Sequence, residues 1–307
     1  MHKLPQYYGI KRGYPRLKRL ISEKISAYIQ LIRVFTLLGA WMAGFFLDVL
    51  FSKPYLNLSH SFLVGMTLAF LQAGGQSFNQ SIREEVEIDK MNGKVYRPTV
   101  SGRMSLKEGK IISSILFLCG ILLAFSLNVN YGMLSILIAF FAVAYTSPPF
   151  RIKKRFFLNN LWQGVARGLL PAIYVASAHQ DYGLLPVFYG IMLAVWVTGA
   201  QASKDFPDLR GDRVYGIQTF PVKLGVDGAL KLMSILIFSG FVILNFLILS
   251  SSFPINFLVL NILAIPSALV VYGSKKNIVL KFAENNLSWC CFYGTLGLFY
   301  MLPVLLI

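Results

Sequence analysis

The sequence is poor in charged residues. Asp, Glu, Lys and Arg together make up 14% of its 307 residues, whereas a soluble domain carries about 25%. Three stretches, Ile111–Leu127, Tyr131–Tyr145 and Leu230–Leu249, contain at most one charged residue each, and 56% of the chain is hydrophobic. This shortage of charge excludes a water-soluble globule as well as a disordered or fibrous chain, and it indicates a protein that crosses a membrane several times.

Cysteine and acidic residues are also scarce. The three cysteines, Cys119, Cys290 and Cys291, lie inside apolar stretches, and their spacing fits neither a disulfide framework nor a metal site. Thirteen acidic residues stand against 29 basic ones, for a formal net charge of +16. Beside membrane spans such an excess is the usual orientation signal, so we expect no nucleic-acid partner. The N-terminus is polar and basic through Lys24, which predicts no removable signal peptide.

Nine apolar runs are long enough to cross a hydrocarbon core about 30 Å thick, which takes roughly 20 helical residues. Because lipid offers the backbone no hydrogen-bond partners, the runs are expected to be helices rather than strands. The predicted fold is an all-α bundle of about nine transmembrane helices. The runs cover residues 26–50, 60–82, 111–127, 130–147, 158–178, 183–204, 228–250, 253–273 and 287–306.

Basic residues predict the orientation of this integral, multi-pass membrane protein. They are concentrated in the tail 1–25 and in the connectors after the second, fourth, sixth and eighth runs, whereas the other connectors share only Lys53. Positively charged connectors stay in the cytoplasm, so the tail and these connectors are predicted to be cytoplasmic. The expected organisation is a basic tail followed by a transmembrane domain, residues 26–307, with acid-rich connectors at 83–110 and 204–227.

Seven of the thirteen acidic residues form two clusters, at 84–89 and 205–212, which follow the second and sixth runs. Glu85 and Asp89 are four residues apart, and Asp208 has the same spacing to Asp212. Asp205 lies three residues before Asp208, so each group shares one helical face. The alternative interpretation is that these are two ordinary solvent-exposed connectors, in which acidic side chains neutralise the charge of nearby basic ones. In a chain so poor in acids, the spacing favours a site.

Two carboxylate clusters that face one another can hold Mg²⁺, which takes oxygen ligands, often one or two carboxylates together with substrate phosphates. Basic residues on the same side suit a diphosphate, whose oxygens accept hydrogen bonds from Lys and Arg. These basic residues are Arg97, Arg103, Arg151, Lys153, Lys204 and Arg213. Mg²⁺ is therefore the expected cofactor.

Two tracts resemble the Asp-rich motifs of the UbiA superfamily of intramembrane prenyltransferases. Residues 79–102 read NQSIREEVEIDKMNGKVYRPTVSG, similar to a family pattern of Asn and two Asp at four-residue intervals, followed by Asn, a basic-Pro pair and Ser-Gly. Residues 204–222 read KDFPDLRGDRVYGIQTFPV, similar to the second motif. The tract YTSPPFRIK, at 145–153, resembles the family's connector between spans four and five, and residues 31–33 resemble the opening of its first helix.

The resemblance implies a Mg²⁺-dependent enzyme that transfers a polyprenyl group from its diphosphate to a lipophilic acceptor. It assigns the metal to Glu85, Asp89, Asp205, Asp208 and Asp212. The residues expected nearest the reaction are Asp89, Asp208, Lys153 and Tyr145. The diphosphate is expected to contact Asn79, Arg97, Arg33, Lys204, Arg213 and Arg151.

The sequence departs from the family pattern at three positions. Glu85 stands where the first motif has its middle Asp, and Arg210 stands where the second motif has Glu. Asn79 precedes Glu85 by six residues instead of four, and Ser81 occupies the expected position. Because of these departures, a second hypothesis stays open, in which the chain is a catalytically weak member of the family and acts as a scaffold.

The acceptor also stays open on these residues. The tracts are similar both to members that prenylate aromatic quinone precursors and to archaeal members that add geranylgeranyl to a glycerophosphate lipid. The expected partners are a polyprenyl diphosphate donor, one of these acceptors, and membrane lipid. A carrier of an anionic amphiphile is the alternative from another class, although both acid clusters lie on one side, unlike the midplane site of a typical carrier.

Overall fold

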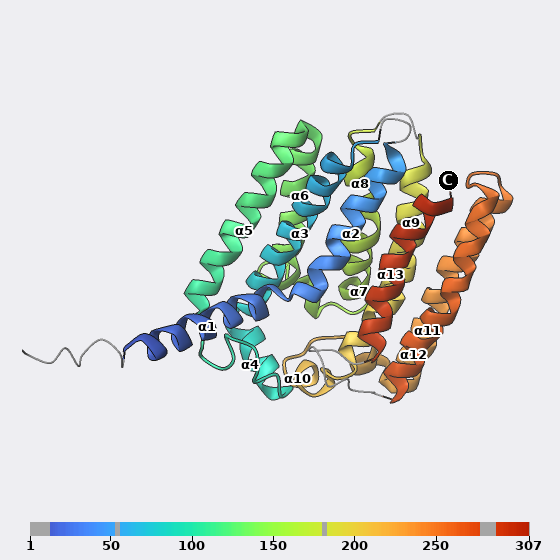
Figure 1. Cartoon of the computed structure of the whole chain (residues 1–307). Helices are drawn as coiled ribbons and strands as arrows, with labels where there is room; N and C mark the ends of the chain where they lie inside the picture. Colours follow the sequence, from blue (N-terminus) through green and yellow to red (C-terminus); the bar gives the residue numbers. More distant parts are fainter. Residues whose placement is uncertain (1–12, 53–55, 180–182, 277–286, 307) are drawn as a thin grey trace, which may run out of the picture.

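The computed structural model describes residues 13–52, 56–179, 183–276 and 287–306, and every regular element within them is helical. Long helices lie side by side and run between two ends of a bundle (Figure 1). One end carries the charged connectors with the short helices α4 (Arg83–Met91) and α10 (Leu209–Val214), and we call it the polar end. The other end, where Asn128 links two helices, is the far end. The predicted all-α bundle is confirmed.

Each of the nine predicted runs corresponds to a helix or to a broken helix. In chain order these are α2 (Val34–Phe51), α3 (Leu58–Gln80), α5 (Leu106–Leu127), α6 (Val129–Thr146), α7 (Leu158–Gly164) with η2 (Val165–Leu169) and α8 (Leu170–Ala176), α9 (Leu185–Ala200) with η4 (Gln201–Asp205), α11 (Phe220–Leu249), η5 (Ile255–Leu263) with α12 (Ala264–Lys276), and α13 (Leu287–Leu306).

Seven helices of the described chain are long and apolar enough to cross a membrane. The predicted number of nine is not established by this criterion. Two of the predicted crossings fall outside it: α3, whose second half is rich in Gln and Asn, and the fifth run, which η2 divides. Both nevertheless run the length of the bundle beside the others (Figure 1).

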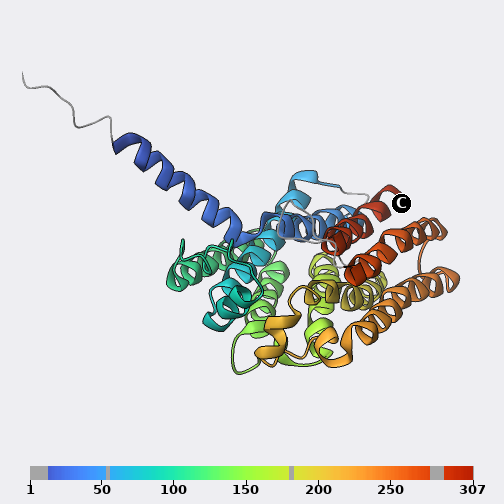
Figure 2. The same cartoon turned by 90° about the horizontal axis from the view of Figure 1, so that it is seen from below.

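The first predicted run, 26–50, is divided between two helices. Helix α1 (Gly13–Ile32) ends at Arg33, whose backbone is left-handed with φ of 54°, and α2 begins at Val34. A left-handed residue ends one helix and redirects the next, so α1 projects sideways from the polar end (Figure 2). Residues 26–32 therefore belong to α1, and the expected tail boundary at residue 25 falls inside it.

Local sequence explains where several helices start. The side chain of Ser105 accepts a hydrogen bond from the backbone N–H of Glu108, which caps α5 in a Ser-x-x-Glu pattern. Asn128 caps α6 in the same way, through the N–H of Asn130. Helix α4 has two acids in its first turn and Lys90 in its last, which complements the helix dipole.

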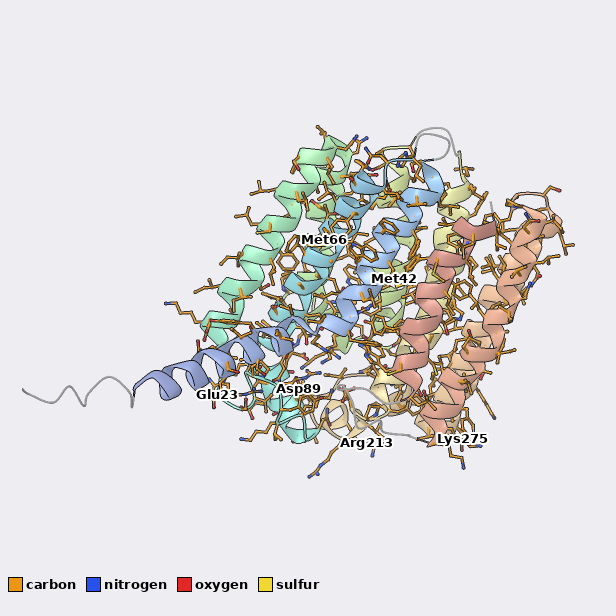
Figure 3. The ribbon with its side chains drawn as sticks, in the orientation of Figure 1. Glu23, Met42, Met66, Asp89, Arg213 and Lys275 are labelled. Atoms are coloured by element: carbon orange, nitrogen blue, oxygen red, sulfur yellow. The ribbon has the colours of Figure 1, made fainter. Side chains whose placement is uncertain are left out.

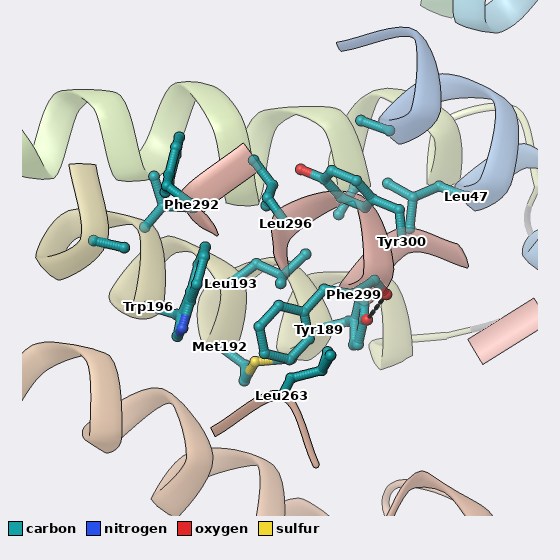
Figure 4. Close-up of a cluster of buried hydrophobic side chains, with 14 of the residues drawn as sticks. Leu47, Tyr189, Met192, Leu193, Trp196, Leu263, Phe292, Leu296, Phe299 and Tyr300 are labelled. Carbon is teal, nitrogen blue, oxygen red and sulfur yellow. Dashed lines mark hydrogen bonds between the residues drawn. The ribbon is translucent and has the colours of Figure 1, made fainter. Parts of the chain in front are cut away.

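Aromatic packing around α9 fixes the centre of the bundle (Figure 4). The Trp196 ring stacks on Phe292 of α13 with centroids 5.6 Å apart, and it meets Phe299 edge-on at 5.2 Å. Its Nε1 donates to Ser267 of α12 at 3.0 Å, and the Tyr189 hydroxyl donates to the backbone carbonyl of Phe299. These contacts join α9, α12 and α13, so the connector that leaves α9 starts from a rigid position.

Candidate active site

The first acid cluster is carried by α4 at the polar end, where Asp89 lies (Figure 3). Helix α3 ends at Gln80, the chain turns, and α4 starts at Arg83. Glu85 and Asp89 share one face of α4, as their spacing predicts, and both are buried, with 3% and 5% of their surface exposed. Buried carboxylates need compensating charges, so their partners define the site.

The second cluster lies opposite α4. Asp205 ends η4, Asp208 is the residue before α10, and Asp212 lies within α10. A hydrogen bond from the backbone N–H of Gly211 to Oδ1 of Asn92, at 2.8 Å, helps to join the two connectors. The two clusters predicted from the sequence therefore meet at one place.

Basic side chains lie between the two clusters. Lys94 Nζ is 2.5 Å from Oδ1 of Asp208 and 3.6 Å from Oδ1 of Asp89. Arg97 donates to Asp89, and Lys153 donates to Glu85. Lys94 was not predicted as a site residue. Its position in the connector after the first motif was the available signal, but nothing in the sequence says which lysine of that connector points inward.

Burial and neighbouring charges perturb the titration of these groups. Burial raises the pKa of Asp212 to about 8, and the nearby carboxylates Asp205 and Asp208 add to this effect against the attraction of Lys153. Burial also acts to raise the pKa of Asp89, but Arg97, Lys94 and Lys153 outweigh it and hold that pKa below its usual value. Asp212 therefore holds its proton more tightly than an exposed carboxyl does, whereas Asp89 is ionised at neutral pH.

Tyr145, at the polar end of α6, is held by two neighbours. Its hydroxyl donates to Oδ1 of Asn159 at 2.6 Å and accepts from Nζ of Lys204 at 2.8 Å. The same Nζ lies 5.2 Å from the centre of the Tyr145 ring, so a positive charge is held at the hydroxyl end of the ring. Asn159, on α7, is a buried positioning residue that the sequence did not single out.

A cavity of about 450 Å³ extends from the acid clusters into the bundle. Apolar and small residues of α2, α3, α6, α7 and α13 line its inner part, among them Gly39, Leu68, Phe141 and Leu296. Eleven of the predicted site residues line it: Arg33, Asn79, Glu85, Asp89, Arg97, Tyr145, Lys153, Lys204, Asp205, Asp208 and Asp212. A charged mouth thus continues into an apolar interior of the size usual for ligand sites.

Two residues that were predicted to contact the diphosphate, Arg151 and Arg213, do not line this cavity. Arg151 pairs with Glu84, as does Lys154, and Arg213 is exposed at the edge of the polar end (Figure 3). Neither arginine belongs to the cavity lining in the described chain. Both face outward because α4 presents Glu84 on a different side from Glu85 and because Arg213 follows the buried Asp212 by one residue.

The irregular junction of α3 and α4 accounts for the displaced Asn79. The turn at 81–82 lets Asn79 line the same cavity as Glu85, although six residues separate them. Ser81, at the position where the family pattern has Asn, is fully buried and donates to the carbonyl of Ser77. A Cβ added to Gly109 of α5 would lie 2.1 Å from its hydroxyl, so Ser81 packs against α5 and not in the cavity.

The residues at the mouth fit a hard divalent cation that also binds a ligand. No three His, Cys, Asp or Glu side chains in the described chain are close enough to hold a metal on their own. Oδ2 of Asp205 is, however, buried without a hydrogen-bond partner among the described residues, and Asp208 and Glu85 are paired with flexible lysines. All these ligand atoms are carboxylate oxygens, which suits Mg²⁺ held by a few carboxylates and by phosphates.

Comparison with known proteins identifies the family. A model described as the UbiA prenyltransferase family matches residues 32–286, which is most of the chain. The chain belongs to this family. It is a prenyltransferase and an integral membrane protein, with the all-helical fold of the UbiA proteins.

Several sequence relatives carry one name, digeranylgeranylglyceryl phosphate synthase. The protein of that name from Saccharolobus solfataricus is 28% identical over 214 residues, which cover 69% of this chain and 74% of the relative. Its counterpart from Methanocaldococcus jannaschii is 28% identical over 209 residues, which cover 67% and 70%.

Solved structures share the fold. A UbiA homologue from Archaeoglobus fulgidus, described as bound to DMAPP and Mg²⁺, matches with a TM-score of 0.67 and 17% identity over 91% of this chain and 96% of the other. A structure described as that of a digeranylgeranylglyceryl phosphate synthase in membranes matches with a TM-score of 0.65 and 24% identity, over 93% and 100%.

Proposed function

We propose that this UbiA-family enzyme transfers a polyprenyl group, such as geranylgeranyl, from its diphosphate to a glycerophosphate-lipid acceptor, with Mg²⁺ as cofactor. The observation that carries the proposal is the meeting of two carboxylate clusters and four basic side chains at the mouth of an apolar cavity. A charged mouth suits a diphosphate, and an apolar interior suits an isoprenoid chain. The names of the relatives favour a glycerophosphate acceptor over an aromatic quinone precursor.

Glu85, Asp89, Asp205, Asp208 and Asp212 would hold Mg²⁺ together with the donor's diphosphate. The bound metal supplies charge neutralisation for the leaving diphosphate. Lys94, Arg97, Lys153 and Lys204 line the same mouth, and each can donate to a diphosphate oxygen once its carboxylate partner turns to the metal. Fixed donors at the leaving group act where negative charge grows in the transition state.

The reaction breaks the bond between C1 of the prenyl chain and the diphosphate oxygen, whose electron pair leaves with the diphosphate. The acceptor hydroxyl then forms a C–O bond to C1 and loses its proton. Tyr145 lines the cavity beside the proposed diphosphate site, and the face of its ring would stabilise positive charge on the allylic carbons. Asn159 and Lys204 fix the orientation of that ring.

We also propose that the polar end faces the cytoplasm. The basic residues of the sequence gather on the connectors at this end, including Arg151, Lys153 and Lys154 of η1 (Ile152–Lys154) and its flank. The hydrophilic headgroups of the two substrates, and Mg²⁺, would then enter the site from the cytoplasmic side.

The test is a transfer assay with the full chain reconstituted in lipid, Mg²⁺ and radiolabelled geranylgeranyl diphosphate. Geranylgeranylglyceryl phosphate is expected to give a labelled product, and 4-hydroxybenzoate is expected to give none. Asp208→Asn removes one carboxylate charge from the mouth and is expected to lower kcat at least about a hundredfold, because transition-state charge stabilisation of this kind contributes that much.

The matched control is Asp227→Asn, the same chemical change at an exposed acid outside the cavity lining, which should keep wild-type activity. Chelation of Mg²⁺ by EDTA should abolish transfer by the wild type. A product with 4-hydroxybenzoate alone would overturn the proposed acceptor. If the folded protein gives no product with any acceptor, the proposed enzyme activity is wrong and the scaffold hypothesis takes its place.

A further inference from the structure

Arg167 lies deep in the cavity, away from the acid clusters. It is carried by η2, a π-helical turn in the middle of the fifth crossing, nine residues beyond Leu158 at the start of α7. At 1.5 Å per residue this is roughly 13 Å into the bundle. Arg167 lines the cavity together with Gln163 and Tyr293. A guanidinium at such a depth is costly, and by default it marks a functional position.

The described hydrogen-bond partners of Arg167 are uncharged. Its Nε donates to Oε1 of Gln163 at 3.2 Å, and Nη1 donates to the hydroxyl of Tyr293. Its Cζ lies 5.5 Å from the centre of the Tyr293 ring. No carboxylate of the described chain forms an ion pair with it, since Glu85 and Asp89 are paired with Lys153 and Arg97 at the polar end. This part of the cavity wall therefore carries an uncompensated positive charge.

Three hydrogen-bond donors around Arg167 are left for a ligand. Its Nη2 has no hydrogen-bond partner among the described residues. The Tyr293 hydroxyl accepts from Arg167, so its own proton is free to be donated, and the Gln163 amide likewise uses only its oxygen here. A cation surrounded by free donors, without an acidic group, is the composition of an anion site.

The turn that carries Arg167 is held rigidly from two sides. Tyr300 of α13 donates its hydroxyl to the backbone carbonyl of Arg167. On the other side, Gly164 and Gly168 pack so closely on α9 that a Cβ added to either would lie 2.4 Å from the backbone of Ala194. A site that is already ordered loses little entropy when it binds a ligand.

We propose that Arg167, with Tyr293 and Gln163, binds the phosphate of the acceptor, a phosphomonoester of a prenylated glycerol. The inference rests on the proposed function and assigns a place to the acceptor's headgroup. In such an acceptor the reacting hydroxyl is only one or two glycerol carbons from the phosphate. A phosphate at Arg167 therefore places that hydroxyl between the two anion sites, where C1 of the donor lies when its diphosphate is at the mouth.

The test measures how much the acceptor's phosphate contributes to binding in each variant. Wild type and Arg167→Gln are assayed with geranylgeranylglyceryl phosphate and with its phosphate-free analogue, geranylgeranylglycerol. For the phosphate-bearing acceptor the substitution should raise KM about tenfold or more, the value of a lost charged hydrogen bond. KM for the phosphate-free acceptor and for the donor should stay unchanged. Arg167→Lys should lie between the two, because it keeps the charge without the planar fork.

Two controls separate this site from the fold and from the proposed reaction. Arg155→Gln makes the same change at an exposed arginine outside the cavity lining and should leave every KM at the wild-type value. Tyr293→Phe keeps the guanidinium and removes one donor, so it should raise the acceptor KM by a smaller factor even if Arg167→Gln fails to fold. Calorimetric binding of geranylgeranylglyceryl phosphate in EDTA, where no transfer occurs, should weaken in the same order.

Three results would overturn the proposal. An equal rise in KM for both acceptors would make Arg167 a structural residue. A rise in the donor KM alone would assign it to the diphosphate. Binding in EDTA that does not depend on Arg167 would exclude the site directly. If the wild type transfers to neither acceptor, the proposed function fails, while the EDTA measurement still decides whether Arg167 binds the phosphate.

Discussion

Lys94 occupies the space between the two acid clusters. Its ammonium lies within 4 Å of carboxylate oxygens of both Asp208 and Asp89, at 2.5 Å and 3.6 Å. A single positive charge shared by two carboxylates is the arrangement expected where a divalent cation also fits. Lys94 thus separates two negative groups that repel one another at close range.

Lys94→Gln tests this role. Without metal, the variant should unfold at a temperature a few degrees lower than the wild type, because Asp208 loses its ion-pair partner in a partly buried site. Mg²⁺ added alone, without the diphosphate that Lys94 is proposed to contact, should then raise its melting temperature by more than it raises that of the wild type, because the metal no longer competes with the ammonium.

Thermal unfolding followed by tryptophan fluorescence gives both numbers. Lys223→Gln, at an exposed lysine in the first turn of α11, is the control and should behave like the wild type. The same Mg²⁺-dependent shift in Lys94→Gln and wild type would refute competition at this position.

Helices α4 and α10 depend on one another at the residue Gly211. A Cβ added there would lie 2.6 Å from Nδ2 of Asn92, whose side chain also accepts the hydrogen bond that joins the two helices. No other residue type fits without moving Asn92 and breaking that bond. The lack of a side chain at Gly211 thus lets the two connectors come close at Asn92.

Gly211→Ala should push the two connectors apart while the transmembrane helices stay folded. We expect kcat to fall at least about tenfold, because small displacements in a site that positions several groups are costly for the rate. Helical circular dichroism should stay unchanged. Gly294→Ala on α13 is the matched control, since nothing lies within 4 Å of its added Cβ. Wild-type kcat in Gly211→Ala would show that the junction does not position the site.

At the scale of elements, apolar run length predicts most of the architecture. Runs such as 111–127 and 287–306 fall within α5 and α13 because only helices satisfy the backbone in lipid. The break at Arg33 was not predicted, since the apolar pattern continues through it and a left-handed residue other than Gly has no sequence signal. The division of the fifth run by the π-helical turn η2 was also missed, because the run continues through its five residues, none of which is Pro.

The candidate site, too, could be predicted from the sequence only in part. The spacing within each acid cluster predicted that Glu85 and Asp89 share a face, because helical periodicity is local. Which basic residue meets which acid depends on contacts across the fold: Lys94 reaches Asp208 over 114 positions, and Lys153 reaches Glu85 over 68. Arg151 and Arg213, chosen by proximity in sequence, face away from the cavity.

On the scale of the whole molecule, the far end is closed by a second polar cluster. Asp48 of α2 is fully buried, and both of its oxygens accept hydrogen bonds from side chains of other helices and connectors. The partners are His60 at 3.2 Å, Ser61 at 2.7 Å, Tyr131 at 3.1 Å and His179 at 2.9 Å. One carboxylate therefore ties α2, α3, α6 and the end of the fifth crossing together. Asp48 lies outside the cavity lining.

Asp48→Asn should destabilise the bundle without changing the chemistry. An amide cannot accept from four donors and brings N–H groups of its own into the cluster, and breaking a buried charged network costs about 3–5 kcal/mol. The melting temperature should fall well below that of the wild type, while KM for both substrates, measured at a temperature where the variant is folded, should stay constant. A changed acceptor KM with an unchanged melting temperature would contradict a purely structural role.

The contact between Arg167 and Tyr293 also has a consequence for biosynthesis. The two residues are 126 positions apart, and Tyr293 belongs to the last described helix. At 5–20 residues per second, a ribosome that has just added Arg167 needs roughly 6 to 25 seconds to reach Tyr293. During that interval the guanidinium enters the bilayer with Gln163, on the same helical run, as its nearest partner. Insertion of the fifth crossing therefore depends on earlier helices or on the insertion machinery, and the cavity wall is completed only when α13 arrives.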